Sequence, residues 1–174
     1  MIEILKASPT HVEGIAKVCR EANWATYKGL RSEEYIKRVI KEFYNHERIL
    51  KEVSETGKEW GGYFVAVEGD VIIGAIGGGM IGENTGEVFV LYLDPNRRSE
   101  GIGTKLLKAL THQQKEEHHA TEQWVSVAKG NQKGIPFYEA RGFQFINEQR
   151  EYGNAEGENY ISLRYVRKIE QTDC

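Results

Sequence analysis

Residues 91–107 read LYLDPNRRSEGIGTKLL, and this stretch decides the fold. A run of β-favouring residues ends at Pro95, a turn with two arginines and two glycines follows, and a helix begins at about Gly101. Glycines leave the backbone N–H groups of such a turn open to a ligand, and the first turn of a helix carries unpaired N–H groups with partial positive charge. The stretch therefore predicts a strand, a turn and a helix that together bind an anion such as a pyrophosphate. A corner that needs its glycines only for close packing is the alternative.

The periodicity of apolar residues extends this pattern to both ends of the chain. It predicts strands at residues 2–5, 63–67, 71–76, 87–93, 124–128, 143–145 and 160–165. It predicts helices at residues 10–22, 32–43, 101–118 and 135–141, the second with a kinked extension to Val53. The order is strand, two helices, three strands, helix, strand, helix, two strands, which is typical of an α+β fold with a mixed sheet flanked by helices.

Local signals support several of these boundaries. Thr10 with Glu13 predicts a capping box at the start of the first helix. Residues 68–70 (EGD) predict a tight hairpin turn, and the three glycines at 77–79 predict a bulge or a close backbone approach. Gly142 stands where a left-handed helix end is expected.

Composition narrows the class of protein. With 174 residues, 40% hydrophobic and 28% charged, the chain fits one globular domain over residues 1–174. The net charge of −3 has no basic block, so nucleic acid is not an expected partner. The two cysteines, Cys19 and Cys174, do not form a disulfide framework, and a reducing compartment is expected.

No targeting or membrane segment is expected. The first residues, MIEILKASPTHVEG, lack the basic start and apolar run of a signal peptide. The longest apolar stretch, residues 71–82, is rich in glycine and too short to span a bilayer. We therefore expect a soluble cytoplasmic protein without a membrane partner.

Two motifs resemble those of a known family. Residues 98–103 (RSEGIG) resemble the Arg/Gln-x-x-Gly-x-Gly/Ala signature of the GNAT superfamily of N-acetyltransferases. Residues 131–143 (NQKGIPFYEARGF) resemble the second hallmark of that family, Asn-x-x-x-x-x-Phe-Tyr-x-x-x-Gly-Phe. The motifs stand in the family's order, and the predicted layout resembles the GNAT fold along nearly the whole chain.

The resemblance implies transfer of an acetyl group from acetyl-CoA, as co-substrate, to an amine. It implies that the strand containing Leu91 diverges from the strand at residues 124–128 and that pantetheine lies in the gap. The implied CoA contacts are Leu91, Tyr92, Leu93, Arg98, Ser99, Glu100, Gly101, Ile102, Gly103, Thr104 and Asn131. Ser99 and Glu100 depart from the usual small and basic residues of the motif. Glu100 places a negative charge near the phosphates, which we expect Arg97, Arg98 and Lys105 to outweigh.

Direct transfer requires a neutral amine, although an alkylammonium is almost wholly protonated at pH 7. The resemblance implies Glu87 as general base, directly or through water, and Tyr138 as general acid toward the CoA sulfur. It also implies that a backbone N–H near Leu93 holds the thioester carbonyl. A solvated Glu87 and a Tyr138 that serves only the core are the alternatives.

The acceptor is less well determined by the residues. The region between the first two helices carries Trp24 and Tyr27, which suit a cationic amine by cation–π contact. This favours a small primary amine or a polyamine, while a protein or peptide acceptor and a non-catalytic acyl-CoA-binding module stay open. Members of the family are often dimers, so a homodimer is one expected state. No metal site is predicted, because His118 and His119 diverge on a helix, and Cys19 lies on an apolar helix face.

Overall fold

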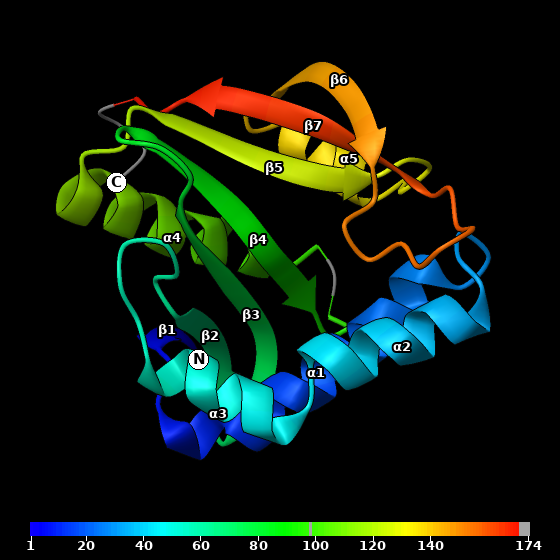
Figure 1. Cartoon of the computed structure of the whole chain (residues 1–174). Helices are drawn as coiled ribbons and strands as arrows, with labels where there is room; N and C mark the ends of the chain where they lie inside the picture. Colours follow the sequence, from blue (N-terminus) through cyan, green and yellow to red (C-terminus); the bar gives the residue numbers. More distant parts are fainter. Residues whose placement is uncertain (98, 171–174) are drawn as a thin grey trace.

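A seven-stranded sheet organises the chain in the computed structural model, which describes residues 1–97 and 99–170 (Figure 1). The strands are β1 (Ile2–Lys6), β2 (Tyr63–Glu68), β3 (Val71–Met80), β4 (Thr85–Leu93), β5 (Glu122–Ala128), β6 (Gln144–Arg150) and β7 (Ile161–Lys168). Their order is β1-β2-β3-β4-β5-β7-β6, and within the described residues only the β4–β5 pair is parallel. The predicted α+β class with a mixed, mostly antiparallel sheet is confirmed.

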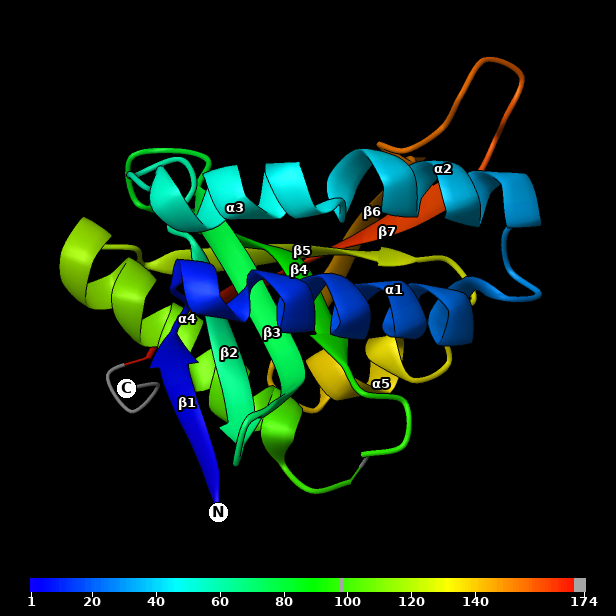
Figure 2. The same cartoon turned by 90° about the horizontal axis from the view of Figure 1, so that it is seen from below.

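The helices cover both faces of this sheet. They are α1 (Val12–Tyr27), α2 (Glu33–Phe43), α3 (His46–Ser54), α4 (Ile102–His118) and α5 (Gly134–Glu139), with a 3₁₀ turn at Pro9–His11. Figure 2 shows α1, α2 and α3 together on one side of the sheet, with α4 and α5 on the other. Of the helices in the described part of the chain, none is both long and apolar enough to span a membrane.

Two details of the N-terminal helices correct the sequence prediction. The predicted capping box of Thr10 is wrong, because Ser8 precedes a 3₁₀ turn and its N–H donates to Nδ1 of His11 at 3.0 Å. The predicted extension to residue 53 is a separate helix, α3, so the element order gains one helix. Asn45 begins it, since its Oδ1 accepts the N–H of Arg48 at 2.8 Å and so satisfies an unpaired donor of the first turn.

Alternation along the strands divides the core into two layers. Ala66 and Ile76 pack with α4, whereas their neighbours Val65 and Ala75 pack with α1 and α3. On β4, both Val88 and Leu91 face the α4 layer. Side chains three residues apart in a regular strand point to opposite faces, so the alternation must be interrupted between them. The reason is a bulge, because Gly77 pairs with Val90 and Gly78 with Val88, leaving Phe89 without a partner on β3.

The predicted bulge at the glycine run is thus confirmed, and so is the close backbone approach. A Cβ on Gly78 would lie 2.2 Å from the carbonyl oxygen of Glu87, and one on Gly79 would lie 1.9 Å from that of Glu59. These clashes are with backbone, which cannot move aside as a flexible side chain can. Only glycine fits at these two positions, and β3 continues through them to Met80, beyond the predicted end at residue 76.

The feature that positions the site is the divergence of β4 and β5. Their ladder joins residues 85–88 of β4 to residues 122–125 of β5 and goes no further. Figure 1 shows the two strands separating beyond this point, as the family resemblance implied. Because β5 continues to pair with β7 up to Ala128, the separation opens a gap in the middle of the sheet and not at its edge.

A buried chain of side-chain amides anchors the sheet where the gap begins. Gln114 of α4 donates to the carbonyl oxygen of Glu87 at 3.0 Å, and its own Oε1 accepts from Gln123 of β5 at 3.1 Å. Both glutamines are 1% exposed or less, and a buried amide without partners would cost about 1–3 kcal/mol. These two hydrogen bonds link β4 and β5 through Gln114 and so stabilise their parallel ladder where the gap begins.

Candidate active site

A cavity of about 180 Å³ fills the gap between β4 and β5 and is called the donor slot below. Its walls come from β4, β5, α1, the start of α4 and the α5 region. Leu91, Tyr92, Leu93 and Asn131, all predicted to contact CoA, line this slot, and so does Gly103. From Phe89 onward, the edge of β4 that faces β5 has no strand partner among the described residues, so its backbone groups are available to an extended ligand.

The turn before α4 has the backbone shape that an anion site requires. Ser99 and Gly101 both adopt left-handed conformations, with φ of 64° and 77°. Gly101 precedes the first helical residue, and a Cβ there would meet nothing within 4 Å, so the space in front of the turn is open. The first N–H groups of α4, from Ile102 to Thr104, have no partner within the helix and are the donors of this end. The predicted contact Arg98 lies outside the described residues.

The charges at this turn pair with one another. Arg97, which was expected to help outweigh Glu100 near the phosphates, binds Glu100 at 2.8 and 2.9 Å and also binds Glu68 at 2.8 and 3.0 Å. These contacts hold the pKa of both carboxyls below the usual range and raise the pKa of Arg97. One guanidinium therefore serves two carboxylates, and Glu100 turns toward Arg97.

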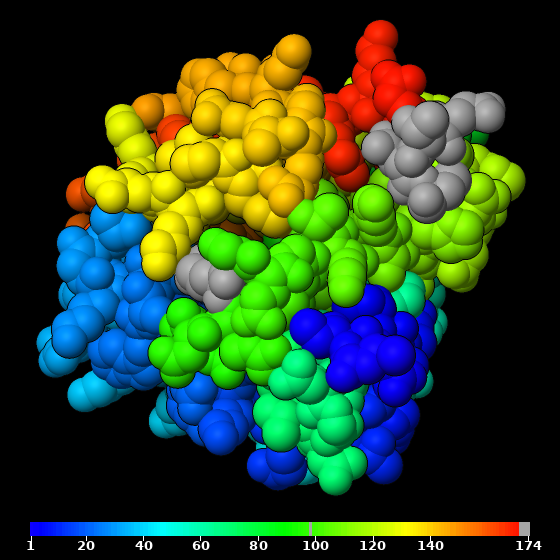
Figure 3. All heavy atoms as spheres, turned by 180° about the vertical axis from the view of Figure 1, so that it is seen from behind, coloured from blue at the N-terminus to red at the C-terminus, as the bar shows by residue number. Residues whose placement is uncertain are grey.

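Sequence reasoning did not single out Arg141, which supplies a cation beside the turn. Its Nε donates to Oγ1 of Thr104 at 3.1 Å, and its guanidinium stacks on the ring of Phe137 at 3.8 Å. Within the described residues no carboxylate pairs with it, and burial lowers its pKa. Figure 3 shows the α5 segment against the start of α4 on this face. The side chain of Thr104 is thus held by Arg141, so any contact of Thr104 with CoA would be made by its backbone N–H.

Tyr138 lines the donor slot from α5. It is 7% exposed, and burial raises the pKa of its phenol, so the hydroxyl stays protonated at neutral pH. In the described part of the chain its hydroxyl has no hydrogen-bond partner. A proton donor that faces a cavity without a protein acceptor is available to a ligand in that cavity.

Asn131 shapes the same slot. Its Oδ1 accepts the N–H of Gly134 at 2.8 Å and that of Lys133 at 3.2 Å, which secures the start of α5. Its amide nitrogen has no acceptor among the described residues and can donate to a ligand. Asn131 therefore fixes the start of the helix that carries Tyr138, four residues after Gly134, while its amide nitrogen stays available in the slot.

A second cavity of about 570 Å³, called the acceptor cavity below, lies on the α1–α3 side of the sheet. Aromatic rings dominate its wall, and three carboxylates and two arginines are set among them. The aromatic residues are Tyr27, Tyr35, Phe43, Tyr44, Trp60, Tyr63, Phe89, Tyr92 and Tyr152. The charged residues are Glu52, Glu87, Glu151, Arg48 and Arg164.

The two cavities share a wall where β4 and β5 part. The residues lining both are Tyr27, Val88, Phe89, Val90, Tyr92 and Ser126. The hydroxyls of Tyr27 and Tyr92 lie 3.4 Å apart, and burial raises the pKa of both. A group in the donor slot can therefore meet a group in the acceptor cavity across this wall.

Glu87 lies on the acceptor side of the shared wall, at the start of β4. Its two carboxylate oxygens accept from Arg164 of β7 at 2.7 and 2.9 Å, and Arg164 also donates to Ser126 at 2.8 Å. The side chains of Glu87 and Arg164 are 12% and 14% exposed, so Glu87 is not the solvated carboxylate of the alternative. A carboxylate offers about four acceptor sites, so this pair leaves room for a further donor.

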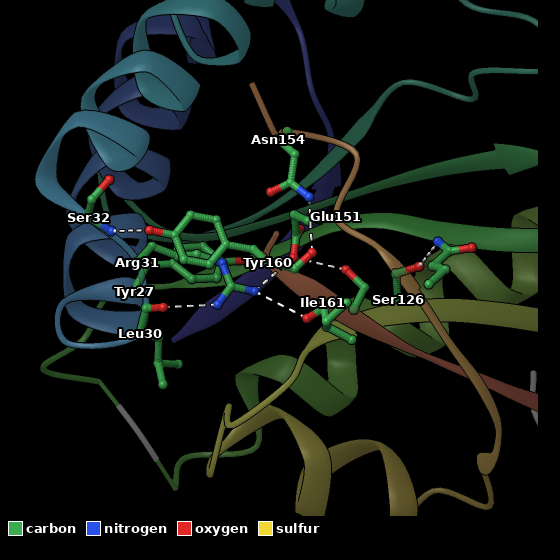
Figure 4. Close-up of polar contacts among 12 residues, drawn as sticks. Tyr27, Leu30, Arg31, Ser32, Ser126, Glu151, Asn154, Tyr160 and Ile161 are labelled. Carbon is green, nitrogen blue, oxygen red and sulfur yellow. Dashed lines mark hydrogen bonds and ion pairs between the residues drawn. The ribbon is translucent and has the colours of Figure 1, made fainter. Parts of the chain in front are cut away.

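A clamp around Arg31 binds Glu151, which lies in the wall of the acceptor cavity (Figure 4). The Arg31 guanidinium donates to Glu151 at 2.9 Å and lies over the ring of Tyr160 at 4.4 Å. Ser162 also donates to Glu151 at 2.9 Å, and the hydroxyl of Tyr160 accepts the N–H of Ser32 at 2.9 Å. These contacts join the α1–α2 connection to the segment between β6 and β7.

Of the two predicted acceptor contacts, the structure places only Tyr27 in the cavity. Trp24 lines neither the donor slot nor the acceptor cavity, so this geometry does not support a role for it. Sequence reasoning missed Glu52, Glu151, Trp60 and Phe89. Of these four residues, only Phe89 carried a local signal, because it is an aromatic residue in the strand that leads into the motif turn. The other three belong to no sequence motif.

Comparison with known proteins agrees with this architecture. A family model described as the acetyltransferase (GNAT) family matches residues 18–143. A spermidine N(1)-acetyltransferase of Thermoplasma acidophilum is 33% identical over 144 residues, which cover 82% of this chain and 88% of that protein.

Solved structures show the same fold. The PaiA N-acetyltransferase of Thermoplasma acidophilum, in complex with coenzyme A, superposes with a TM-score of 0.80 at 29% identity, over 97% of this chain and 99% of that one. The ribosomal-protein-S18-alanine N-acetyltransferase of Escherichia coli has a TM-score of 0.68 at 16% identity, over 98% and 96% of the two chains, which shows the fold alone. The motif turn, the divergent strands and the matched family model lead to one conclusion: this chain belongs to the GNAT acetyltransferase family and is an N-acetyltransferase.

Proposed function

We propose that the protein transfers the acetyl group of acetyl-CoA directly to a primary amine of a small molecule, with polyamines as the best-fitting class. The observation that carries this proposal is the meeting of two cavities where β4 and β5 part, with Tyr138 on one side and Glu87 on the other. A relative whose name specifies spermidine supports the acceptor class.

The donor slot fits coenzyme A. The open space before Gly101 and the first N–H groups of α4 suit the pyrophosphate. The unpaired edge of β4 from Phe89 to Leu93 suits the amides of pantetheine, and Asn131 can donate from the opposite wall. Bound acetyl-CoA supplies an acetyl group activated as a thioester.

Glu87 is the general base of this proposal. The acceptor enters the cavity as an ammonium, and its proton must leave before the nitrogen can attack. The carboxylate of Glu87 faces the cavity at the shared wall, and Arg164 fixes its orientation through both oxygens. Glu87 takes the proton directly or through a water molecule in the cavity.

Tyr138 is the general acid. Tyr138 lines the donor slot, and its raised pKa keeps its unpartnered hydroxyl protonated. The hydroxyl can therefore donate a hydrogen bond to the leaving sulfur and stabilise the negative charge that develops there. The hydroxyls of Tyr27 and Tyr92 stay neutral between the two groups and orient the amine.

The acceptor cavity favours a small amine over a protein or peptide. Its walls come from α1, α2, α3 and five strands, and Glu151 in this wall is bound by Arg31. The aromatic rings and carboxylates of its wall suit a small organic cation.

The experiment that tests this function follows thiol release from acetyl-CoA with a panel of amines. Spermidine, 1,4-diaminobutane, an aminoglycoside, amino acids and a lysine peptide form the panel. We expect fastest release with the polyamines and diamines. Coenzyme A binding without release on any amine would favour an acyl-CoA-binding module, and preference for the peptide would contradict the small-molecule acceptor.

A further inference from the structure

We propose that Glu52 binds a second cationic group of the acceptor and so makes the enzyme select diamines and polyamines over monoamines. This inference rests on the proposed function and assigns a recognition residue to it. It concerns the part of the acceptor cavity formed by Glu52, Arg48, Trp60 and Tyr63, on the side of α3.

The three carboxylates of the acceptor cavity differ in how fully their own arginines bind them. Glu87 accepts from Arg164 through both oxygens at 2.7 and 2.9 Å. Glu151 accepts from Arg31 and from Ser162, both at 2.9 Å. Glu87 and Glu151 are therefore engaged by strong donors before any ligand arrives.

Glu52 is engaged only weakly. The nearest nitrogen of its arginine, Nε of Arg48, is 3.6 Å away, beyond hydrogen-bond distance. The hydroxyl of Tyr63 donates to Oε1 of Glu52 at a long 3.3 Å. Of the three carboxylates, Glu52 thus has the most unused capacity to accept hydrogen bonds from a ligand.

Two further observations favour a ligand cation over Arg48 as the partner of Glu52. The Arg48 guanidinium lies over the ring of Phe43 at 4.6 Å, and its side chain is 41% exposed, against 22% for Glu52. Burial raises the pKa of the Glu52 carboxyl, the larger effect, while Arg48 lowers it. The anion therefore carries a desolvation cost that its own arginine does not offset, and an ammonium in the cavity would reduce that cost.

An aromatic wall connects Glu52 to the shared wall where the reacting amine lies. Nε1 of Trp60 donates to the main-chain oxygen of Glu52 at 2.8 Å, and the Trp60 ring stacks with Phe89 at 6.4 Å. The Trp60 ring packs directly against Gly77, where a Cβ would come within 2.4 Å of it. One amine can therefore reach the shared wall beside Phe89 while the hydrocarbon chain lies along Trp60 and a second ammonium reaches Glu52.

The test compares butylamine, 1,4-diaminobutane and spermidine as acceptors, with acetyl-CoA at saturation. We expect Glu52→Gln to lower kcat/KM for the diamine and the triamine by roughly 10- to 100-fold through KM, the range for a lost charge-assisted hydrogen bond. Butylamine has no second cation, so its kcat/KM should stay unchanged. Glu47→Gln is the matched control, because Glu47 lies on the same helix, is exposed and lines neither cavity.

Arg48→Met provides a second variant that does not depend on the stability of Glu52→Gln. It removes the cation that competes for Glu52, so KM for the diamine should fall while KM for butylamine does not. Equal effects of Glu52→Gln on butylamine and the diamine, or a diamine KM that does not fall in Arg48→Met, would overturn the role of Glu52. A wild-type protein that acetylates no amine would instead overturn the proposed function.

Discussion

The donor slot and the acceptor cavity meet at one wall but are built in different ways. Most of the donor slot comes from two short segments, residues 88–103 and 125–138, and several of its expected contacts are backbone groups. The acceptor cavity is assembled from single side chains that range from Asn23 to Arg164. Contiguous segments encode a backbone shape, so a motif can report it, whereas a cavity of dispersed side chains exists only once the helices and strands have packed.

The largest expected effect tests the donor side. Tyr138→Phe removes the proposed acid with almost no change in volume, and kcat should fall by about 100- to 10,000-fold, the usual contribution of a positioned acid or base. KM for acetyl-CoA should change little. Steady-state kinetics with a diamine measures both constants.

Tyr165→Phe is the matched control for Tyr138. Tyr165 is 3% exposed and packs in the same core cluster, yet it lines neither cavity. If the two variants lost activity equally, the role of Tyr138 would be structural. Because burial raises the pKa of Tyr138 above its ordinary 10.0, wild-type activity should not decline below about pH 10 through loss of this proton.

The next effect tests the acceptor side. Glu87→Gln should lower kcat at pH 7 by roughly 100-fold, and the loss should shrink as pH rises toward the amine pKa of about 10, where the acceptor no longer needs a base. The variant also weakens the pair with Arg164, which should lower the free energy of unfolding by about 1–3 kcal/mol.

The double variant Glu87→Gln/Arg164→Met separates the two effects of Glu87. It removes both partners and should recover part of the stability without recovering activity at pH 7. A pH–rate profile and urea unfolding of each variant measure the two quantities. A loss of kcat that stays constant with pH would show that Glu87 only positions Arg164.

A smaller effect tests the backbone of the motif turn. Gly101→Ala places a Cβ on a residue with φ of 77°, and Gly69→Ala does the same at φ of 61° in the β2–β3 hairpin. Neither Cβ would meet another atom within 4 Å, so each variant should lose about 1–2 kcal/mol of stability through backbone strain alone. Only Gly101→Ala should also raise KM for acetyl-CoA, by about 5- to 30-fold if the turn relaxes by that amount.

The matched glycines make this a direct test of the donor slot. Thermal unfolding gives the stability loss, and KM for acetyl-CoA gives the functional loss. An unchanged KM in Gly101→Ala would mean that the turn does not hold coenzyme A.

The smallest effect concerns the carboxylates beside Arg97. The folded pKa of Glu68 is lowered by the bond from Arg97, so its stabilising effect is present above the ordinary pKa of 4.5 and is lost as pH falls through the lower folded value. Thermal unfolding of wild type and Glu68→Gln should therefore differ slightly at pH 6–7 and converge below pH 4.5. Glu83→Gln, in an exposed turn, is the control and should show no such convergence.

Local sequence was informative about the donor side because its signals are short-range. Pro95, the glycines of the turn and the Phe137–Tyr138 pair act on their own backbone neighbours, and the structure brings Leu91, Leu93, Asn131 and Tyr138 into one cavity as expected. The same reasoning did not anticipate contacts that cross the fold. Arg97 was expected to help outweigh Glu100 and does bind it, but Glu68, 29 residues away, shares the same guanidinium.

Period-two alternation also failed at one residue of β4. Residues 87–93 read as a regular strand, but the bulge at Phe89 reverses which side chains face α4 beyond it. The cause is the glycine run of the partner strand β3, so the signal lay on another segment. A regular strand would have predicted the wrong face for Leu91 and Tyr92.

The α+β class, all of the element order except the separate helix α3, and the glycine turn before a helix followed from the amino-acid sequence, because hydrophobic period and turn chemistry act over a few residues. The acceptor cavity, the pairing of Glu87 with Arg164 and the weakly bound carboxylate of Glu52 required the folded protein. Those contacts join side chains up to 77 residues apart, and their burial and charge balance arise only when the layers pack. The proposed acceptor preference therefore depends on contacts between residues far apart in the sequence, whereas the donor site is indicated by a local sequence motif.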